Sequence, residues 1–101
     1  MTLDVNQSEN TYTIKVQCSR LTLACSEELK ERVKPLLSQN GSIAIIDLEG
    51  VKFIDSSGIG SLLALVKQAK MCNSKLYIAN IEDGVKDLFV LLRLDKIFEI
   101  K

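Results

Sequence analysis

The sequence predicts an α/β fold with a mixed, mostly parallel sheet of 4-5 strands and about three helices. Strand-like and helix-like hydrophobic patterns alternate along most of the chain. Such alternation is typical of right-handed crossovers between parallel strands. Two strand-like segments come first, so we expect the order β-β-α-β-α-β-α-β with an antiparallel hairpin at the amino terminus.

The hairpin is predicted from a period of two. Every second residue of one early segment is apolar, namely Tyr12, Ile14, Val16 and Cys18. This alternation indicates a half-buried strand. Leu3 and Val5 indicate its partner strand, and the polar residues 7–10 suit the turn between the two.

The first helix is predicted from apolar residues at helical spacing. Its core face consists of Leu29, Val33, Leu36 and Leu37. Ser26 is a candidate N-cap, because Glu27 and Glu28 would then lie in the first turn and complement the helix dipole. Pro35 lacks a backbone donor, so we expect the helix to kink or stop near it.

The middle of the chain combines an apolar strand with a second helix. Residues 43–46 are continuously apolar, which is typical of a strand covered on both faces. After Asp55, a helix is expected from about Ser57 to Met71. Its predicted core face is Ile59, Leu62, Leu63 and Val66.

The last third of the chain repeats the alternation. Residues 76–79 predict a strand, and Glu82 and Asp83 are expected at the start of a third helix. The core face of this helix is Val85, Leu88, Phe89 and Leu92. Residues 97–100 suggest a short closing strand.

Length and composition narrow the functional classes. The 101 residues suit one domain, residues 1-101. Thirteen basic and thirteen acidic residues cancel, which argues against nucleic acid as a partner. No apolar run is long enough to insert into a membrane, and the first residues do not resemble a secretory signal. We therefore expect a cytoplasmic protein.

No metal or cofactor site is expected. The chain has no His, and Cys18, Cys25 and Cys72 lack ligand-like spacing, so reduced and mostly buried thiols are the expectation. Gly58 and Gly60 invite comparison with a dinucleotide-binding loop, but the third glycine of that motif is absent.

Asp55-Ser56-Ser57-Gly58 is the candidate site, because it stands where a strand should become a helix. A serine nucleophile needs a general base, and without His only a dyad with Lys52 could supply one. We therefore expect that the chain has no catalytic activity. A phosphoryl group on Ser56 or Ser57 would meet the amides and positive dipole of the helix start. The alternative is plain helix capping by Asp55 or Ser56.

A row of small residues on the second helix is a candidate docking surface. The row consists of Ser57, Gly60 or Ser61, Ala64 and Gln68. Gly60 inside a helix costs about 1 kcal/mol relative to Ala, and small residues let another backbone approach closely. The alternative is that Gly60 lies against a loop of the chain itself.

The segment IAIIDLEGVKFIDSSGIGSLLALVKQAK resembles the anti-sigma factor antagonist family, the bacterial STAS domain. The family pattern is an apolar strand ending in Asp, a short loop, an aromatic–apolar pair, and then Asp-Ser-Ser/Thr/Ala-Gly-Leu/Ile-Gly. The matching residues here are Asp47, Phe53, Ile54, Asp55, Ser56, Ser57, Gly58, Ile59 and Gly60. The segment KLYIANIEDGVKDLFVLLRLDKIFEI also resembles the closing part of the family, so the resemblance covers nearly the whole chain.

The resemblance implies a non-catalytic regulator. Members of the family bind a cytoplasmic anti-sigma factor, often a serine kinase, and thereby release a sigma factor. The resemblance also implies that the kinase phosphorylates Ser56 and that a phosphatase removes the phosphate. The partner-binding residues that it implies are Thr22, Asp55, Ser56, Ser57, Gly58, Ile59, Gly60, Ser61 and Ala64.

The chain departs from the family in one segment of the expected site, where both the Gly and the Asp of the family pattern are missing. Relatives have Gly-x-Leu/Ile-Asp where this chain has Ser19-Arg20-Leu21-Thr22. Thr22 can keep a hydrogen bond but not the charge of the family Asp. This substitution favours an alternative function, a STAS-like scaffold or subunit that binds a membrane-transport complex without phosphorylation.

Overall fold

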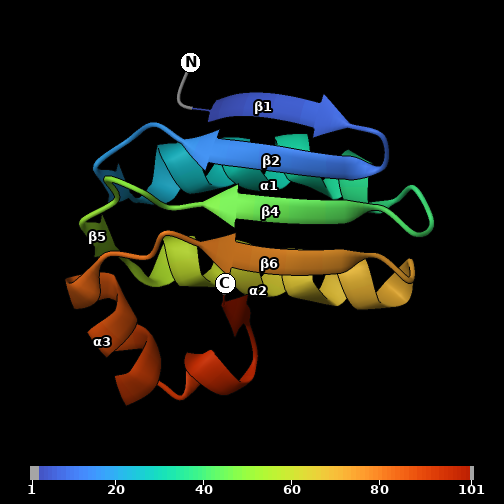
Figure 1. Cartoon of the computed structure of the whole chain (residues 1–101). Helices are drawn as coiled ribbons and strands as arrows, with labels where there is room; N and C mark the ends of the chain where they lie inside the picture. The colour runs from blue at the N-terminus through green and yellow to red at the C-terminus, as the bar shows by residue number, and fades with distance from the viewer. Residues whose placement is uncertain (1–2, 101) are drawn as a thin grey trace.

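The computed structural model describes residues 3–100, which form a five-stranded sheet with three α-helices (Figure 1). The order across the sheet is β1-β2-β4-β6-β7, with bounds Leu3–Ser8, Thr11–Val16, Ile43–Asp47, Lys75–Ala79 and Glu99–Ile100. β1 is antiparallel to β2, and the other neighbouring pairs are parallel. The predicted fold class is confirmed.

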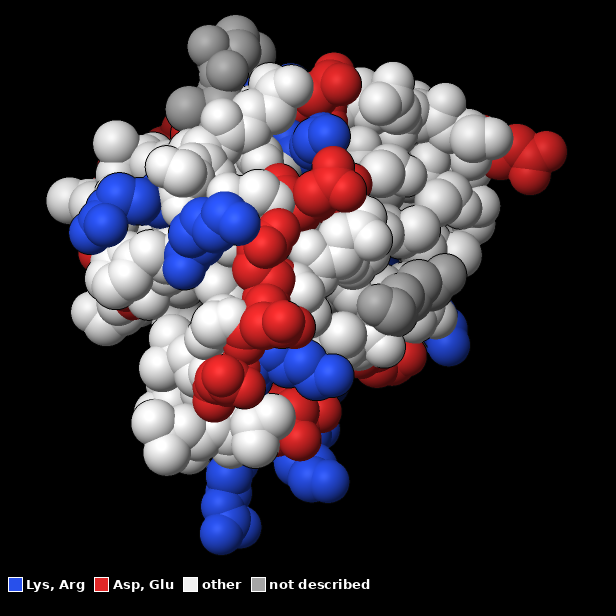
Figure 2. Space-filling view, turned by 60° about the vertical axis from the view of Figure 1, so that its left-hand side comes forward, with Lys and Arg blue, Asp and Glu red and all other residues white. Residues whose placement is uncertain are grey.

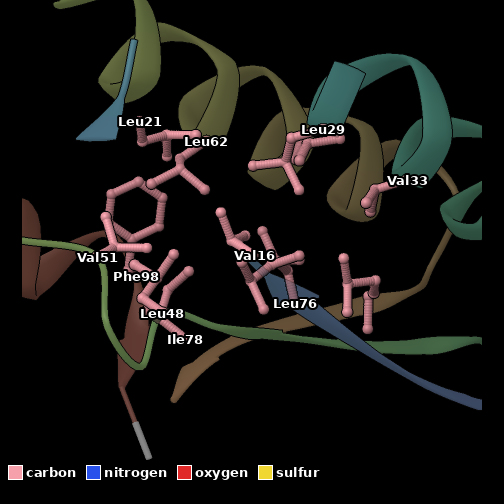
Figure 3. Close-up of a cluster of buried hydrophobic side chains, with 14 of the residues drawn as sticks. Val16, Leu21, Leu29, Val33, Leu48, Val51, Leu62, Leu76, Ile78 and Phe98 are labelled. Carbon is pink, nitrogen blue, oxygen red and sulfur yellow. The ribbon is translucent and has the colours of Figure 1, made fainter. Parts of the chain in front are cut away.

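Two helices cover one face of this sheet. α1 (Leu23–Leu37) and α2 (Ser56–Met71) lie side by side behind the strands in Figure 1. α3 (Asp83–Leu91) and the 3₁₀ helix η1 (Leu94–Lys96) lie beside the β6–β7 edge. In the core, helix and strand side chains point toward one another; Figure 3 labels among them Leu29, Val33, Leu62, Val16, Leu76 and Ile78. None of the helices in residues 3–100 is long and apolar enough to cross a membrane.

The prediction that the apolar strand is covered on both faces was wrong. Ala44 and Ile46 of β4 are buried under the helices, but Ile43 and Ile45 face the open side and are half-buried. Across that open face Ile45 lies between Thr13 of β2 and Tyr77 of β6 in register. Neighbouring strands therefore shield these side chains in part, and the continuous apolar run does not require a second helical layer.

The first helix starts earlier than the sequence predicts. α1 begins at Leu23, and its N-cap is Thr22, with extended backbone (φ −111°, ψ −166°). Ser26 is fully buried inside the helix, and its hydroxyl donates to the Leu23 carbonyl at 3.0 Å. The prediction of Ser26 as N-cap was therefore wrong, and no acidic residue lies in the first turn. Pro35 does lie close to the end of the helix.

The buried face of α2 is rotated from the predicted one. The buried residues are Gly58, Ser61, Leu62, Leu65 and Ala69, whereas Ile59, Leu63 and Val66 are only partly buried. α2 packs against α1 as well as on β6, so its buried arc turns toward the neighbouring helix. Hydrophobicity alone does not indicate this rotation, because small residues occupy the close contacts.

The end of the chain also differs in detail. Leu92 follows α3 and is 50% exposed, so it is not part of the core face of that helix. The closing strand is shorter than predicted, because β7 contains only Glu99 and Ile100. Phe98 is buried just before the strand and stacks on Phe89 of α3, with 5.3 Å between ring centroids.

Candidate functional site

Two strand–cap–helix units stand side by side at the carboxyl edge of the sheet. β3 (Arg20–Leu21) and β5 (Phe53–Ile54) form a separate, parallel pair that the sequence analysis did not predict. Thr22 follows β3 and caps α1, and Asp55 follows β5 and caps α2. The positive ends of both helix dipoles therefore lie at the same place.

Asp55 caps α2 with its side chain. Its backbone is extended (φ −96°, ψ −174°), and Oδ1 accepts a hydrogen bond from the Gly58 amide at 3.0 Å. The same oxygen accepts one from the Ser57 hydroxyl at 2.6 Å. These two donors, Ser57 first, lower the pKa of Asp55 from its ordinary value of 3.8. The capping carboxylate is thus held ionised at neutral pH.

The two serines of the motif have different environments. The Ser57 hydroxyl is half-buried and engaged with Asp55. Ser56 is the first residue of α2 and is exposed, and within residues 3–100 its hydroxyl has no hydrogen-bond partner. Capping by Asp55 is confirmed, whereas Ser56 takes no part in it. The accessible hydroxyl at this helix start is therefore that of Ser56.

Ser26 is a site residue that the sequence analysis assigned to another role. Its buried hydroxyl lies 3.5 Å from the Ser57 hydroxyl and so joins α1 to the Asp55–Ser57 pair. The contact spans 31 positions in the sequence. A helix predicted to start at Leu23 would have placed Ser26 one turn inside it, but no local signal pairs it with Ser57.

Gly58 is required by close packing. A Cβ atom at this position would lie 2.5 Å from the Leu21 carbonyl oxygen and 2.7 Å from Cγ2 of Ile54. Both distances are below van der Waals contact, and the first neighbour is backbone that cannot move aside cheaply. Gly58 is therefore buried against β3 and β5, where it allows α2 to start directly on this strand pair.

Thr22 stands beside the site but does not replace a capping side chain. It is half-buried at the start of α1, and its side chain makes no capping hydrogen bond. The Thr22 carbonyl accepts from the Ser26 amide at 2.8 Å. The start of α1 thus lacks the negative charge that an Asp would supply.

The remaining predicted partner-binding residues lie at different depths along α2. Gly60 and Ala64 are exposed, and Ile59 is half-buried. Ser61 is 7% exposed, so Gly60 rather than Ser61 continues the exposed row. A Cβ atom on Gly60 would meet nothing within 4 Å in the part of the chain that the structure describes, so this glycine does not pack against a described loop.

Apolar and cationic side chains border the site on the strand pair. The Arg20 guanidinium lies over the Phe53 ring, 4.3 Å from its centroid, a cation–π arrangement. Phe53 is 42% exposed and Leu23, the first residue of α1, is 60% exposed. These residues were not predicted as part of the site, because exposed apolar positions cannot be recognised until both elements are placed.

The surface next to the site is acidic. Figure 2 shows the edge where the parallel strands end, with a band of acidic side chains across it. Glu82 accepts from the Gly50 amide at 3.0 Å and pairs with Lys52 at 3.2 Å, and these contacts lower its pKa. Lys52 is thereby paired with Glu82, so the structure does not support a Ser–Lys dyad at this site.

The STAS domain family model matches residues 2–101 of this chain. The chain belongs to the STAS domain family. It is similar to an anti-sigma-B factor antagonist from Bacillus subtilis, with 26% identity over 98 residues, which cover 97% of this chain and 88% of that protein.

Solved structures show the same fold. A STAS domain protein from Planctomyces limnophilus superposes with a TM-score of 0.82 at 19% identity, over 98% of this chain and 87% of that chain. The anti-sigma factor antagonist SpoIIAA in its unphosphorylated form superposes with a TM-score of 0.80 at 18% identity, over 98% of this chain and 87% of that chain. The murine anion transporter Slc26a9 gives 0.75 at 21%, over 94% of this chain but only 16% of that chain.

Proposed function

We propose that this chain is an anti-sigma factor antagonist that is switched by reversible phosphorylation of Ser56. The unphosphorylated chain binds an anti-sigma factor of the serine-kinase type in the cytoplasm and so releases a sigma factor. The kinase places a phosphoryl group on Ser56, and a phosphatase removes it. The similarity to anti-sigma factor antagonists supports the partner, and the site geometry supports the residue.

The observation that carries this proposal is the hydroxyl of Ser56, which is exposed and has no hydrogen-bond partner among residues 3–100. The cap of α2 is supplied by Asp55, so modification of Ser56 breaks no hydrogen bond of the fold. A phosphoryl group there carries about −1.5 to −2 charge, beside the ionised Asp55. The phosphoryl group therefore weakens the binding of a protein that covers the site, rather than the stability of the fold.

The switch is tested by comparing two variants for binding to a purified serine-kinase anti-sigma factor from the same genome. We expect Ser56→Asp to weaken binding at least about tenfold, because the added carboxylate imitates part of the phosphoryl charge. Ser56→Ala should bind as the wild type does but accept no phosphate from the kinase and ATP. Titration calorimetry measures the affinity, and mass spectrometry locates the phosphate.

Ser8→Asp is the matched control, because Ser8 is also exposed but lies at the far end of β1. It should retain full affinity. Equal affinities of Ser56→Asp and Ser56→Ala would contradict the switch, as would a phosphate found on Ser57.

A second function is a STAS-like scaffold or subunit of a membrane-transport complex that is not phosphorylated. The structural likeness to Slc26a9 and the uncharged Thr22 cap favour it. Under this function Ser56 would accept no phosphate from a serine-kinase anti-sigma factor of the same genome, and the chain would co-purify with a transporter subunit. Thr22→Asp separates the two functions. If the chain is a kinase substrate, this variant should be phosphorylated at Ser56 faster than the wild type, and if it is a scaffold, neither protein should be phosphorylated.

We propose no catalytic activity for the chain. Neither serine of the motif contacts a Lys, and the chain has no His; Ser57 donates to the Asp55 carboxylate, which caps α2, and Ser56 has no partner within residues 3–100. A serine-directed phosphonate should therefore label neither residue, and mass spectrometry of the treated chain checks this.

A further inference from the structure

A groove lies between α1 and α2 on the outer side of the helix pair. Its volume is about 300 Å³, and it is lined by Lys30, Lys34, Ala64, Leu65, Lys67, Gln68 and Met71. A second hollow of about 530 Å³ adjoins it on α1 and shares Lys30 and Lys34. Ala64 is exposed and Met71 is 70% exposed, so these two residues supply its apolar surface, whereas Leu65 is fully buried. This volume suits one or two apolar side chains of another molecule.

The groove is positively charged. Among the described residues, three lysines and no acidic residue line it, and Glu31 lines only the adjoining hollow. Within residues 3–100, none of these lysines forms an ion pair with the chain's own carboxylates. α2 itself contains no Asp or Glu but carries Lys67 and Lys70. The charge of this surface is thus opposite to that of the acidic edge in Figure 2.

The exposed row of α2 connects the groove to Ser56. Ser56, Gly60 and Ala64 follow one another at i, i+4 and i+8 and therefore share one face of the helix. Lys67 is eleven residues beyond Ser56, or about 16 Å along the helix axis. One protein surface of ordinary interface size can span that distance.

Gly60 gives an independent reason to expect a close neighbour along this row. The helix bears the cost of a glycine in its interior, yet a Cβ atom there would meet none of the described residues within 4 Å. The space over Gly60 is therefore open in this chain and fits the approach of another molecule.

We propose that the groove between α1 and α2 binds an acidic amphipathic helix of the anti-sigma partner. Apolar side chains of that helix pack on Ala64 and Met71, and its Asp and Glu residues reach Lys30, Lys34 and Lys67. This is the helix-in-groove mode of recognition. The inference rests on the proposed function and specifies where and how the partner docks.

The groove also explains how one phosphoryl group could release the whole partner. An acidic helix is attracted by the lysines of the groove, and this attraction acts over about 8–10 Å at physiological ionic strength. A phosphoryl group on Ser56 adds negative charge at the other end of the same row. It opposes the acidic partner by charge as well as by bulk.

The test measures the affinity and association rate of the anti-sigma factor with four variants. Lys34→Glu/Lys67→Glu reverses the charge of the groove, and Ala64→Gln adds bulk with a good helix former. We expect each to weaken binding at least about tenfold. The wild-type association rate should fall as salt rises, and less so in the double lysine variant. Gly60→Ala should raise the thermal midpoint by a few degrees but weaken binding.

Lys75→Glu/Lys86→Glu is the matched control, because both lysines are exposed and lie outside the groove on β6 and α3. It should bind as the wild type does. If Ser56→Asp loses binding but the groove variants bind within about twofold of the wild type, the docking proposal is overturned and the proposed function stands.

If the wild type binds no anti-sigma factor, the proposed function fails. A peptide titration then tests separately whether the groove binds an acidic amphipathic helix. The probe is a synthetic amphipathic helix of Glu, Leu and Ala, titrated into the isotope-labelled chain. Shifts of the amides of Gly60, Ala64 and Met71 that disappear in Lys34→Glu/Lys67→Glu would support the groove. Shifts elsewhere, or none, would overturn it.

Discussion

Asp55 shows how one residue combines a structural and an electrostatic role. Its carboxylate closes the start of α2 through Gly58 and Ser57 and remains ionised because both donors favour the charged form. Ser57 is thereby engaged with the cap and Ser56 is left exposed. Two adjacent serines thus have different environments, one hydrogen-bonded to the cap and one exposed.

Ser57→Ala should raise the pKa of Asp55 toward its ordinary value of 3.8, since the largest cause of the lowering is removed. A carboxyl whose folded-state pKa is lowered stabilises the fold above its unfolded pKa, and this stabilisation is lost as pH falls through the lowered value. The variant should therefore lose the contribution of Asp55 at higher pH than the wild type. A ¹³C-detected carboxyl titration of both proteins measures the change, and an unchanged Asp55 pKa would contradict it.

At the scale of the elements, a pair of buried serines closes the end of α1 opposite the candidate site. Ser42 and Ser74 are 2% and 9% exposed, and their hydroxyls lie 3.0 Å apart. Ser42 donates to the Leu36 carbonyl at 2.8 Å, and Ser74 to the Leu37 carbonyl at 2.7 Å. These carbonyls belong to the last turn of the helix, where intrahelical donors are lacking.

Ser74→Ala should lower the free energy of unfolding by about 1–3 kcal/mol, because buried acceptors lose their donor. Urea unfolding followed by circular dichroism measures this loss. Ser8→Ala removes an exposed hydroxyl instead and should be within about 0.5 kcal/mol of the wild type. A Ser74→Ala value as small as that of the control would show that water replaces the lost donor.

At the scale of the whole molecule, the closing segment is attached through an aromatic pair. Phe89 of α3 is fully buried and stacks on Phe98, which is 4% exposed. This contact fixes η1 and β7 beside β6. The neighbouring Leu91 is 77% exposed, so large apolar residues of α3 divide sharply between core and surface.

Phe89→Ala should lower the free energy of unfolding by about 3–5 kcal/mol, a large fraction of the stability of a domain of this size. Leu91→Ala, on the same helix, should change it by no more than about 0.5 kcal/mol. Chemical denaturation measures both. Similar losses in the two variants would mean that α3 is not anchored through Phe89.

The sequence alone determined the order of the main elements, the mixed sheet and the motif at the start of α2. Periodicity and local turn chemistry are properties of consecutive residues, so they can be read without coordinates. Asp55 as a cap and the position of Ser56 at a helix start follow from the same local logic. The start of α1 was misplaced because Ser26 is a good cap by type, whereas Thr22 caps by its backbone position alone.

Only the tertiary structure decided which residues meet. It paired β3 with β5, brought Ser26 to Ser57 and turned the buried face of α2 toward α1. It also left the second face of the sheet open, cleared the space over Gly60 and placed the lysines of two helices around one groove. These features depend on packing between segments that are distant in the sequence. A hydrophobic pattern predicts that a face of a helix or strand is buried, but it does not predict which side chain of another element that face contacts.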